Sequence, residues 1–462
     1  MLALLFVMVP AACGPTPSMA QEPDWHKGFI VIPQGPEDFS SHRFKRSLRN
    51  LADTNANFVN FLLQYTQSSY KAADIHPSGN TPTDASLVEG IRYARSLGLR
   101  VALTLHVGSP DVDGRALINP PDREGWFQAY EKVLLHYADI AQANGVELMV
   151  IGAEMIKMTI PASHPDNTEH WREMIRAVRQ RYSGKLTYSA NWGIDGWLNE
   201  KDQVEFWDEL DYIGIAAYFN LSSPYTMESL LQEWDHWNRT HIMPLQRRYN
   251  KPVLFTEVGY RSADGNLAHP WNYRHRGGPD QGEQADGFQA LFAYWRNFPF
   301  MHGVHLWYWD TDPNAGGPGT TNYTPQRKEA QEVIAQWFDK MPVVPAIFAA
   351  AKSNLTPVIA TQPTEISLRL VGTAPAPDTL VSVELYDASG RRVLQRTFQA
   401  HQPNDGEGRT YVFYWVPPED GEYTIKVGVF SSDWSVDHFW EDKAGSFQAA
   451  PGNSDRQAPS GG

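Results

Sequence analysis

Between residues 27 and 340, short apolar runs alternate with segments in which apolar residues recur every three or four positions. The runs are typical of buried strands, and the recurring positions are typical of amphipathic helices. The predicted strands are Gly28–Pro33, Phe58–Tyr65, Arg100–His106, Glu147–Glu154, Lys185–Asn191, Tyr212–Tyr218, Val253–Glu257 and Gly303–Trp309. The predicted helices, one after each strand, are Phe44–Thr54, Ala85–Leu97, Gly125–Asn144, His170–Tyr182, Val204–Glu209, Met227–Tyr249, Glu283–Asn297 and Pro325–Lys340. Eight such pairs predict an α/β fold, a (β/α)8 barrel, over residues 26–342.

An open, doubly wound sheet would show the same alternation of strands and helices. Such a sheet normally has a glycine-rich turn after its first strand to bind a nucleotide, and none follows Gly28–Pro33. The barrel is therefore the favoured fold.

The pattern changes at Met341-Pro342-Val343-Val344-Pro345, which marks a predicted domain boundary. Beyond it, short β-like segments separated by turn residues predict a small all-β, Ig-like sandwich over residues 355–449. Its predicted strands are Glu365–Val371, Thr379–Leu385, Arg392–Phe398, Arg409–Trp415 and Glu422–Phe430. Residues 450–462 are polar, and we expect a disordered tail there.

The first thirteen residues form an apolar run that ends in small residues and Cys13, the only cysteine of the chain. This pattern is typical of an export signal and is too short for a membrane-spanning helix. It resembles a bacterial lipobox, which implies lipidation at Cys13 and an exported product held to the membrane by its lipid alone. An ordinary cleaved signal with an incidental cysteine is the alternative. Residues 14–25 are predicted to be a Pro/Ser/Gln tether.

The formal net charge of −14 argues against a nucleic-acid partner, which would require basic patches. Some of the 16 tryptophans are candidates for stacking against sugar rings.

No cofactor or metal is predicted, because the chain lacks a phosphate loop, a His-Glu-x-x-His motif and a cysteine cluster. Asp111-Val112-Asp113-Gly114 matches only a fragment of a calcium loop, so a solvated turn is favoured there.

Two glutamates stand at the ends of predicted strands, Glu154 on the fourth and Glu257 on the seventh. In a (β/α)8 barrel, these ends open onto the face that carries the active site. A carboxyl pair there suits glycoside hydrolysis, in which one group protonates the leaving oxygen and the other attacks the anomeric carbon. A single strand-end glutamate is more often the partner of an arginine, but two at these positions favour catalysis.

Three stretches make this hypothesis more specific: Ile151-Gly152-Ala153-Glu154, Phe255-Thr256-Glu257-Val258-Gly259-Tyr260 and His305-Leu306-Trp307-Tyr308-Trp309. Residues 26–340 resemble the large clan of retaining glycoside hydrolases that includes cellulases and mannanases. They are most similar to glycoside hydrolase family 113, known for endo-β-1,4-mannanases. The resemblance implies that Glu154 is the acid/base and Glu257 the nucleophile. Ala153 departs from the asparagine that much of the clan uses to contact the sugar 2-hydroxyl, so this contact is unassigned.

Further candidates for substrate binding stand at other strand ends. By resemblance, Tyr218 would hydrogen-bond the nucleophile, and Trp307 would be the platform beneath the sugar at the cleavage point. From strand-end position alone, the other candidates are Gln64, Tyr65, His106, Asn191, Trp192 and Trp309. Each of these side chains also has a structural alternative as part of the core.

The long segment Ala263–Gly282 contains several aromatic residues, which predicts either the wall of a sugar subsite or a solvated insertion. Trp434, Phe439 and Trp440 are interpreted either as a sugar-binding face or as residues that pack against the barrel.

The sequence thus predicts a retaining glycoside hydrolase acting on a β-linked polysaccharide or oligosaccharide, with mannan as the leading substrate by resemblance. The alternatives are a β-glucanase or xylanase with the same machinery, and a non-catalytic glycan-binding lipoprotein.

Overall fold

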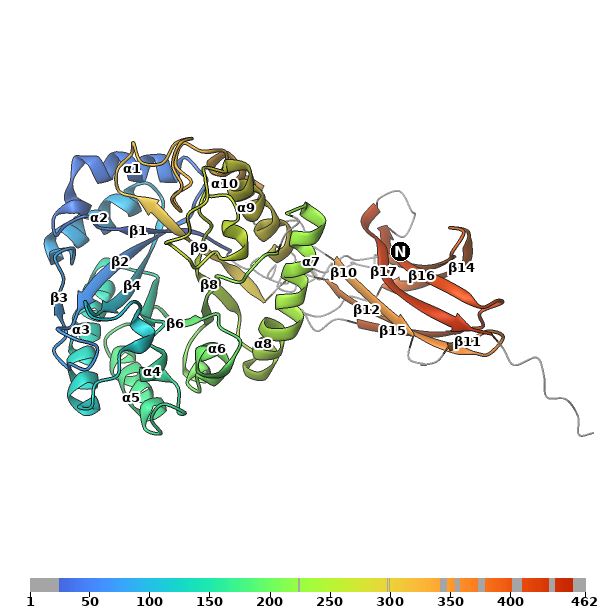
Figure 1. Ribbon diagram of the computed structural model, residues 1–462, viewed down its shortest axis with the longest axis horizontal. Coiled ribbons are helices and arrows are strands. Elements are labelled where there is room, and N and C mark those ends of the chain that lie inside the picture. Colours follow the sequence, from blue (N-terminus) through green and yellow to red (C-terminus); the bar gives the residue numbers. More distant parts are fainter. Residues whose placement is uncertain are drawn as a thin grey trace, which may run out of the picture.

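The computed structural model describes residues 25–222, 225–296, 298, 300–340, 347–353, 358–372, 379–400, 409–431 and 437–451. Within them, eight parallel strands form a closed ring surrounded by helices (Figure 1). In ring order the strands are β1 (His26–Ile32), β2 (Phe58–Thr66), β4 (Arg100–Gly108), β5 (Leu148–Ala153), β6 (Lys185–Asn191), β7 (Ile213–Ala216), β8 (Val253–Val258) and β9 (Met301–Asp310). Because β9 also pairs with β1, the ring closes, and the predicted (β/α)8 barrel is confirmed.

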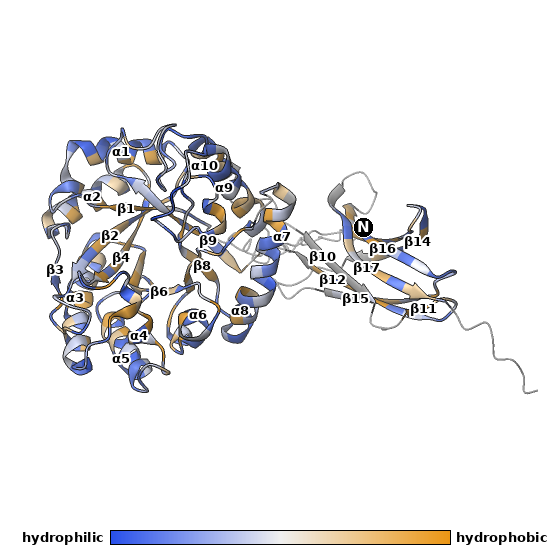
Figure 2. Cartoon of the chain, viewed as in Figure 1, coloured by the Kyte–Doolittle hydropathy of each residue, from blue (hydrophilic) through white to orange (hydrophobic). Residues whose placement is uncertain are grey.

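The barrel helices cover the outside of the ring. They are α1 (His42–Ala52), α2 (Asp84–Ser96), α3 (Arg123–Asn144), α4 (Ile156–Thr159), α5 (Asn167–Arg179), α6 (Glu200–Gln203), α7 (Met227–Trp237), α8 (Met243–Tyr249), α9 (Gln281–Trp295) and α10 (Glu329–Lys340). Figure 2 shows largely hydrophobic barrel strands inside helices that carry hydrophilic residues as well. No helix in the described part of the chain is both long and apolar enough to cross a bilayer.

Local sequence determines where several of these helices begin and end. The side chains of Ser41, Thr83, Asp122 and Asp280 accept hydrogen bonds from backbone N–H groups in the first turns of α1, α2, α3 and α9. These N–H groups have no partner within the helix, so each capping side chain stabilises the helix start by about 1 kcal/mol. Helix α3 ends at Gly145, whose φ of 63° favours glycine.

Two helical predictions need correction. The predicted helix Val204–Glu209 is only a 3-10 turn, Trp207–Glu209, and the α-helical turn α6 precedes it. The predicted helix Met227–Tyr249 is divided into α7 and α8 by a π-helical turn, Asn238–Ile242. Pro244 lies in the first turn of α8 and has no N–H to donate to the preceding turn, which accounts for the local change in helix geometry.

Polar side chains also lie inside the barrel, toward the amino-terminal ends of its strands. The Asn60 amide donates to His305 Nδ1 at 2.9 Å, and its oxygen accepts from the Thr104 hydroxyl at 2.8 Å. His305 Nε2 lies 3.3 Å from His26 Nδ1. Because Nδ1 of His305 accepts, its Nε2 carries the proton and donates to His26. Both buried rings are neutral, since burial lowers the pKa of His305 to about 3 and that of His26 well below 6.5.

The C-terminal region forms two sheets around a separate core. One sheet has the order β10-β12-β15 and the other β11-β17-β16-β13-β14. The strands are β10 (Ile347–Ser353), β11 (Val358–Ile359), β12 (Thr364–Gly372), β13 (Thr379–Asp387), β14 (Arg392–Ala400), β15 (Arg409–Trp415), β16 (Gly421–Ser431) and β17 (Asp437–Ala450). Apolar residues of both sheets meet, including Leu368 from β12 and Val427 from β16. The predicted all-β module is confirmed, and β10, β11 and β17 are additions to it.

Candidate active site

Glu154 and Glu257 lie at the carboxyl ends of β5 and β8, on the face where barrel enzymes bind substrate. Glu257 is part of β8, and its side chain is 4% exposed. Glu154 directly follows β5, and its side chain is 15% exposed. Its φ of 50° lies in the left-handed region, which costs about 1–2 kcal/mol for a residue other than glycine. Such strain is found mostly where function fixes a side chain in place.

Two residues of the β4 side, His106 and Arg115, connect the two carboxyl groups. Arg115 donates to Glu154 Oε2 and to His106 Nδ1, each at 2.8 Å. A guanidinium can only donate, so Nδ1 of His106 accepts and the ring proton lies on Nε2. His106 Nε2 therefore donates to Glu257 Oε1 at 2.9 Å. Arg115 and His106 thus form a continuous hydrogen-bonded bridge from Glu154 to Glu257.

A third carboxyl group, that of Glu200 in α6, acts on Glu154 indirectly by holding Asn191. Glu200 is fully buried and accepts hydrogen bonds from the Tyr188 hydroxyl, the Thr159 hydroxyl and the Asn191 backbone N–H. The Asn191 side-chain amide then donates to Glu154 Oε1 at 2.8 Å. The amide is oriented by the Gly193 N–H, which donates to its oxygen. Asn191 is therefore held at both its backbone and its side chain.

Aromatic rings form the wall beside the glutamates. The Trp307 ring stacks on His106, with centroids 6.0 Å apart and planes at 19°. Gly259 lies so close to Trp307 that a Cβ there would come within 2.2 Å of the Trp307 carbonyl oxygen, so only glycine fits. Trp192 meets Tyr218 edge-on, and the Tyr218 hydroxyl donates to Glu257 Oε2 at 3.4 Å. Flat apolar rings next to a carboxyl pair suit the apolar face of a sugar.

Burial and the charge of Arg115 shift the pKa values of Glu154, Glu257 and His106. Burial raises the pKa of Glu257 to about 7 and also raises the pKa of Glu154, while Arg115 opposes both shifts. Burial and Arg115 hold the pKa of His106 well below 6.5, so His106 is neutral. The carboxyl pair can therefore retain a proton near neutral pH. A neutral acid beside an ionised carboxylate is the combination that glycoside hydrolysis requires.

Two loops from opposite sides of the ring meet across the mouth of the barrel. Strands β4 and β8 are four positions apart in either direction round the ring. Residues 109–122 follow β4, and residues 259–280 follow β8. Asp113 of the first loop accepts from the Tyr273 hydroxyl at 2.6 Å and pairs with Arg274 at 3.1 Å. Together the two loops form a strap over the site.

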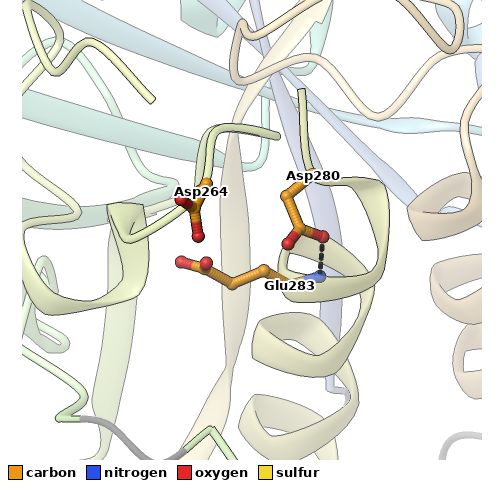
Figure 3. A group of neighbouring side chains, drawn as sticks. All are labelled: Asp264, Asp280 and Glu283. Carbon is orange, nitrogen blue, oxygen red and sulfur yellow. Dashed lines mark hydrogen bonds between the residues drawn. The ribbon is translucent and has the colours of Figure 1, made fainter. Parts of the chain in front are cut away.

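The second strap loop is anchored by three acidic residues at its base, Asp264, Asp280 and Glu283 (Figure 3). Their carboxylate oxygens lie within 4.8 Å of one another. Glu283 accepts the backbone N–H groups of Gly265 and Leu267, and Asp280 caps α9 by accepting from the Glu283 N–H. These bonds account for the cluster as a structural anchor of the loop. The same loop places Trp271 against Trp192, with ring centroids 6.4 Å apart.

Comparison with known proteins identifies the family. The model of Glycoside Hydrolase Family 113 matches residues 32–343. The chain belongs to glycoside hydrolase family 113. It is 28% identical to a GH113 β-1,4-mannanase solved as a complex, over 68% of this chain and 99% of that one, with a TM-score of 0.60. It is 27% identical to the GH113 β-mannanase from Alicyclobacillus acidocaldarius in complex with ManMIm, over 68% and 97%, with a TM-score of 0.60. A search of curated proteins gave no match.

As a family 113 member, the chain is a glycoside hydrolase, and most residues expected at its site do come together. His106, Asn191 and Tyr218 contact the glutamates, and Trp192 and Trp307 lie beside them. Gln64 and Tyr65 line an adjoining pocket. Cys13 and Trp434 lie outside the described residues.

Trp309 does not reach the site, which corrects its prediction. A register shift between β1 and β9 leaves Leu306 opposite Phe29 but Trp309 opposite Val31. The extra residue reverses the side to which the following side chain points. Trp309 is therefore buried in the helix layer, where it packs on Phe29 and donates to the Ser47 hydroxyl.

Sequence reasoning missed Arg115, Asp113 as a strap residue, and Glu200. All three lie outside the strands, where periodicity gives no signal. The calcium-loop fragment that contains Asp113 is instead a connecting turn: Asp111 accepts the Tyr70 backbone N–H, and Asp113 contacts the opposite loop.

Proposed function

We propose that this family 113 enzyme hydrolyses β-1,4-mannan with retention of anomeric configuration. The observation that carries the proposal is the pair of glutamates, Glu257 buried and Glu154 partly buried, joined by Arg115 and His106 in a chain of this family. The substrate is supported by the two similar structures, both described as β-mannanases. The likeness to each covers almost all of that protein but only 68% of this chain.

Glu257 acts as the nucleophile. Its ionised oxygen attacks the anomeric carbon, and the bond to the leaving oxygen breaks as Glu154 donates its proton to that oxygen. The result is a covalent glycosyl-enzyme. Water then attacks the same carbon, Glu154 takes a proton from this water, and Glu257 leaves as a carboxylate. Two displacements on one carbon return its original configuration.

The surroundings of each glutamate support these roles. Glu257 is the more buried of the two and receives donors from His106 and Tyr218 on its two oxygens, which orient the carboxylate for attack. Glu154 is more open to solvent, where the leaving group departs and water arrives. Its contact with Arg115 stabilises the ionised form that serves as the base in the second step.

The aromatic wall holds the sugar. Trp307 presents a ring beside Glu257, and Trp192 and Trp271 continue the surface outwards. Trp271 is 45% exposed, which leaves its ring available for stacking. Asn191 donates to Glu154, and we infer that it also contacts a hydroxyl of the cleaved sugar.

The test is a product screen on β-mannan, glucomannan, xylan and mixed-linkage β-glucan, with proton NMR of the first product. We expect release of manno-oligosaccharides whose new reducing ends are initially β. Turnover confined to xylan or glucan would assign the same machinery to another glycan. An initial α-product would overturn retention.

We also propose that the enzyme is exported and lipid-anchored through Cys13. The apolar run before Cys13 and its small flanking residues support this. Metabolic labelling with a palmitate analogue should mark the wild-type chain but not Cys13→Ser. Equal labelling, or its absence in both, would contradict the anchor.

A further inference from the structure

Glu200 is a fully buried carboxyl group that the two displacement steps do not use. It belongs to the short helix α6, outside the barrel strands. Within the described residues, none of its hydrogen-bond partners is a cation. A carboxyl group buried without a cation costs free energy, so proteins retain one where its contacts or its charge are needed. Both its contacts and its charge lead to Glu154.

One oxygen of Glu200 holds the backbone that follows Glu154. The Tyr188 hydroxyl donates to Glu200 Oε1 at 2.8 Å and accepts the Met155 backbone N–H at 2.7 Å. The Thr159 hydroxyl, in α4, donates to the same oxygen at 2.6 Å. Met155 directly follows Glu154, whose φ of 50° lies in the left-handed region. These bonds therefore fix the chain at the point where a strained backbone must be maintained.

The other oxygen of Glu200 holds the side chain that contacts the Glu154 carboxyl group. Oε2 accepts the Asn191 backbone N–H at 2.8 Å, and the Asn191 amide donates to Glu154 Oε1 at 2.8 Å. Glu200 thus holds Glu154 by two routes, one through the backbone and one through Asn191. An ionised carboxylate only accepts hydrogen bonds, and all three partners of Glu200 can donate, so these bonds favour its ionised form.

The charge of Glu200 also acts on Glu154. Burial raises the pKa of Glu200 to about 7, its three donors oppose that shift, and the charge of Glu154 raises the pKa further. Repulsion between two carboxylates is mutual, so an ionised Glu200 opposes the loss of the proton from Glu154. Above about pH 7, where Glu200 is ionised, this effect is at its strongest.

The other ionisable groups nearby leave this effect in place. Burial raises the pKa of three tyrosines well above 10, so they are uncharged: Tyr130, Tyr188 and Tyr218. Lys201, next to Glu200 in α6, pairs with Asp202. The groups that face Glu154 from the other elements are Arg115, His106 and Glu257. Arg115 and Glu200 therefore act on Glu154 with opposite charges.

We propose that Glu200 is a positioning residue for the acid/base: its carboxylate holds Glu154 in place, and its negative charge keeps on Glu154 the proton that the leaving oxygen receives. This role rests on Glu154 as the acid/base under Proposed function. It does not depend on mannan as the glycan. The charge should matter only for substrates whose leaving group needs that proton, and 2,4-dinitrophenolate departs without it.

The test compares Glu200→Gln with wild type by the pH dependence of kcat/KM, which reports the groups of the free enzyme. The substrates are a β-oligosaccharide that the wild type cleaves and the 2,4-dinitrophenyl glycoside of the same sugars. Glutamine keeps the shape of the side chain, and its carbonyl oxygen can still accept the Asn191 N–H, whereas the charge is lost. Glu154 then loses its proton more easily. We expect the alkaline limb on the oligosaccharide to move down by about one pH unit, which is about tenfold in kcat/KM on that limb.

The acid limb and kcat/KM on the dinitrophenyl glycoside should change little in Glu200→Gln. Glu384→Gln, which removes a buried carboxylate of β13 in the C-terminal region, is the matched control and should behave as wild type. Tyr188→Phe keeps the charge of Glu200 and releases the Met155 N–H, so it tests the hold on the backbone separately. We expect it to lower kcat/KM on the oligosaccharide about tenfold and to leave the alkaline limb in place.

A loss of equal size on both substrates at every pH in Glu200→Gln would show a structural role and overturn the proposal. An unchanged alkaline limb in Glu200→Gln, or unchanged kcat/KM in Tyr188→Phe, would also overturn it. If wild type itself shows the same alkaline limb on both substrates, Glu154 is not the acid, and the role assigned under Proposed function is what fails.

Discussion

The Nε2–H of His106 donates to Glu257 Oε1 at 2.9 Å, and this proton is placed there because Arg115 occupies Nδ1. One imidazole thus orients the proposed nucleophile while remaining neutral. Replacement by phenylalanine keeps the ring and removes the donor. A hydrogen bond to a charged group contributes about 1.5–3 kcal/mol, so we expect kcat to fall roughly 10- to 150-fold in His106→Phe. Steady-state kinetics on an aryl β-mannoside would measure it; an unchanged kcat would contradict the role.

The two glutamates should differ in how their loss can be repaired. Glu257→Ala removes the nucleophile, and we expect kcat to fall by about 10⁴-fold or more. Glu154→Ala still forms the glycosyl-enzyme from substrates with good leaving groups, and azide can then replace the water that lacks its base. We expect azide to restore turnover and give a β-glycosyl azide only in Glu154→Ala. Glu169→Ala, exposed on α5, is the control for loss of a surface carboxylate. A β-glycosyl azide formed by Glu257→Ala, or by neither variant, would contradict the assignment.

Arg115 should set the pH range of activity. Its charge lowers the pKa of Glu257 and of Glu154, both of which burial raises. The nucleophile must be ionised, so activity is lost as pH falls through its pKa. The acid must be protonated, so activity is lost as pH rises through its pKa. Without the guanidinium both pKa values rise, and the whole bell-shaped profile of kcat/KM should move to higher pH in Arg115→Gln.

Arg115→Lys retains the charge and should keep the profile closer to that of wild type. Arg172→Gln, in a surface ion pair on α5, should leave it unchanged. If the pH profile of Arg115→Gln keeps its original range and only its maximum falls, Arg115 acts through its position and not through its charge.

Periodicity was sufficient to predict the barrel and the two glutamates, because alternation and burial act along each strand separately. It failed at Trp309, where a single extra residue in the pairing of β9 with β1 reversed the side chain's direction. No local pattern marks such an irregularity. Gln64 and His106 lie where β2 and β4 pair in regular register, whereas Trp307 reaches the site from within the irregular pairing of β9 with β1.

The bridge between the glutamates was not predictable in the same way. Arg115 lies in an irregular loop nine residues beyond His106, and only tertiary contacts determine where its side chain ends. Glu200 acts through the backbone of Asn191, which the sequence cannot show. The strand-end glutamates could therefore be located from the sequence, whereas Arg115 and Glu200, which orient the site, required the structure.

The strap should discriminate between polymer and short chains. Its contacts, from Asp113 to Tyr273 and Arg274, are exposed, and such pairs contribute about 0–1 kcal/mol. We infer that a strap held this weakly can open, and that while closed it hinders a long chain from lying across the site. In Asp113→Ala we expect the ratio of kcat/KM on soluble mannan to that on mannotriose to rise several-fold, with little change in the thermal midpoint. Asp139→Ala, in an ion pair on α3, is the control. An unchanged ratio would show that the strap does not limit access.

His305 should make the barrel sensitive to acid. Burial lowers its pKa to about 3 in the folded protein, whereas an unfolded histidine has a pKa of about 6.5. Between these values the unfolded chain binds a proton that the folded chain excludes, so stability falls as pH falls through this window, by up to about 1.4 kcal/mol per pH unit for this group. Glutamine can accept from Asn60 and donate to His26 without titrating, so His305→Gln should show a shallower loss of the thermal midpoint between pH 6.5 and pH 4 than wild type. His136→Gln, on the exposed face of α3, should retain the wild-type slope. Parallel slopes for wild type and His305→Gln would mean that other groups set the acid limit.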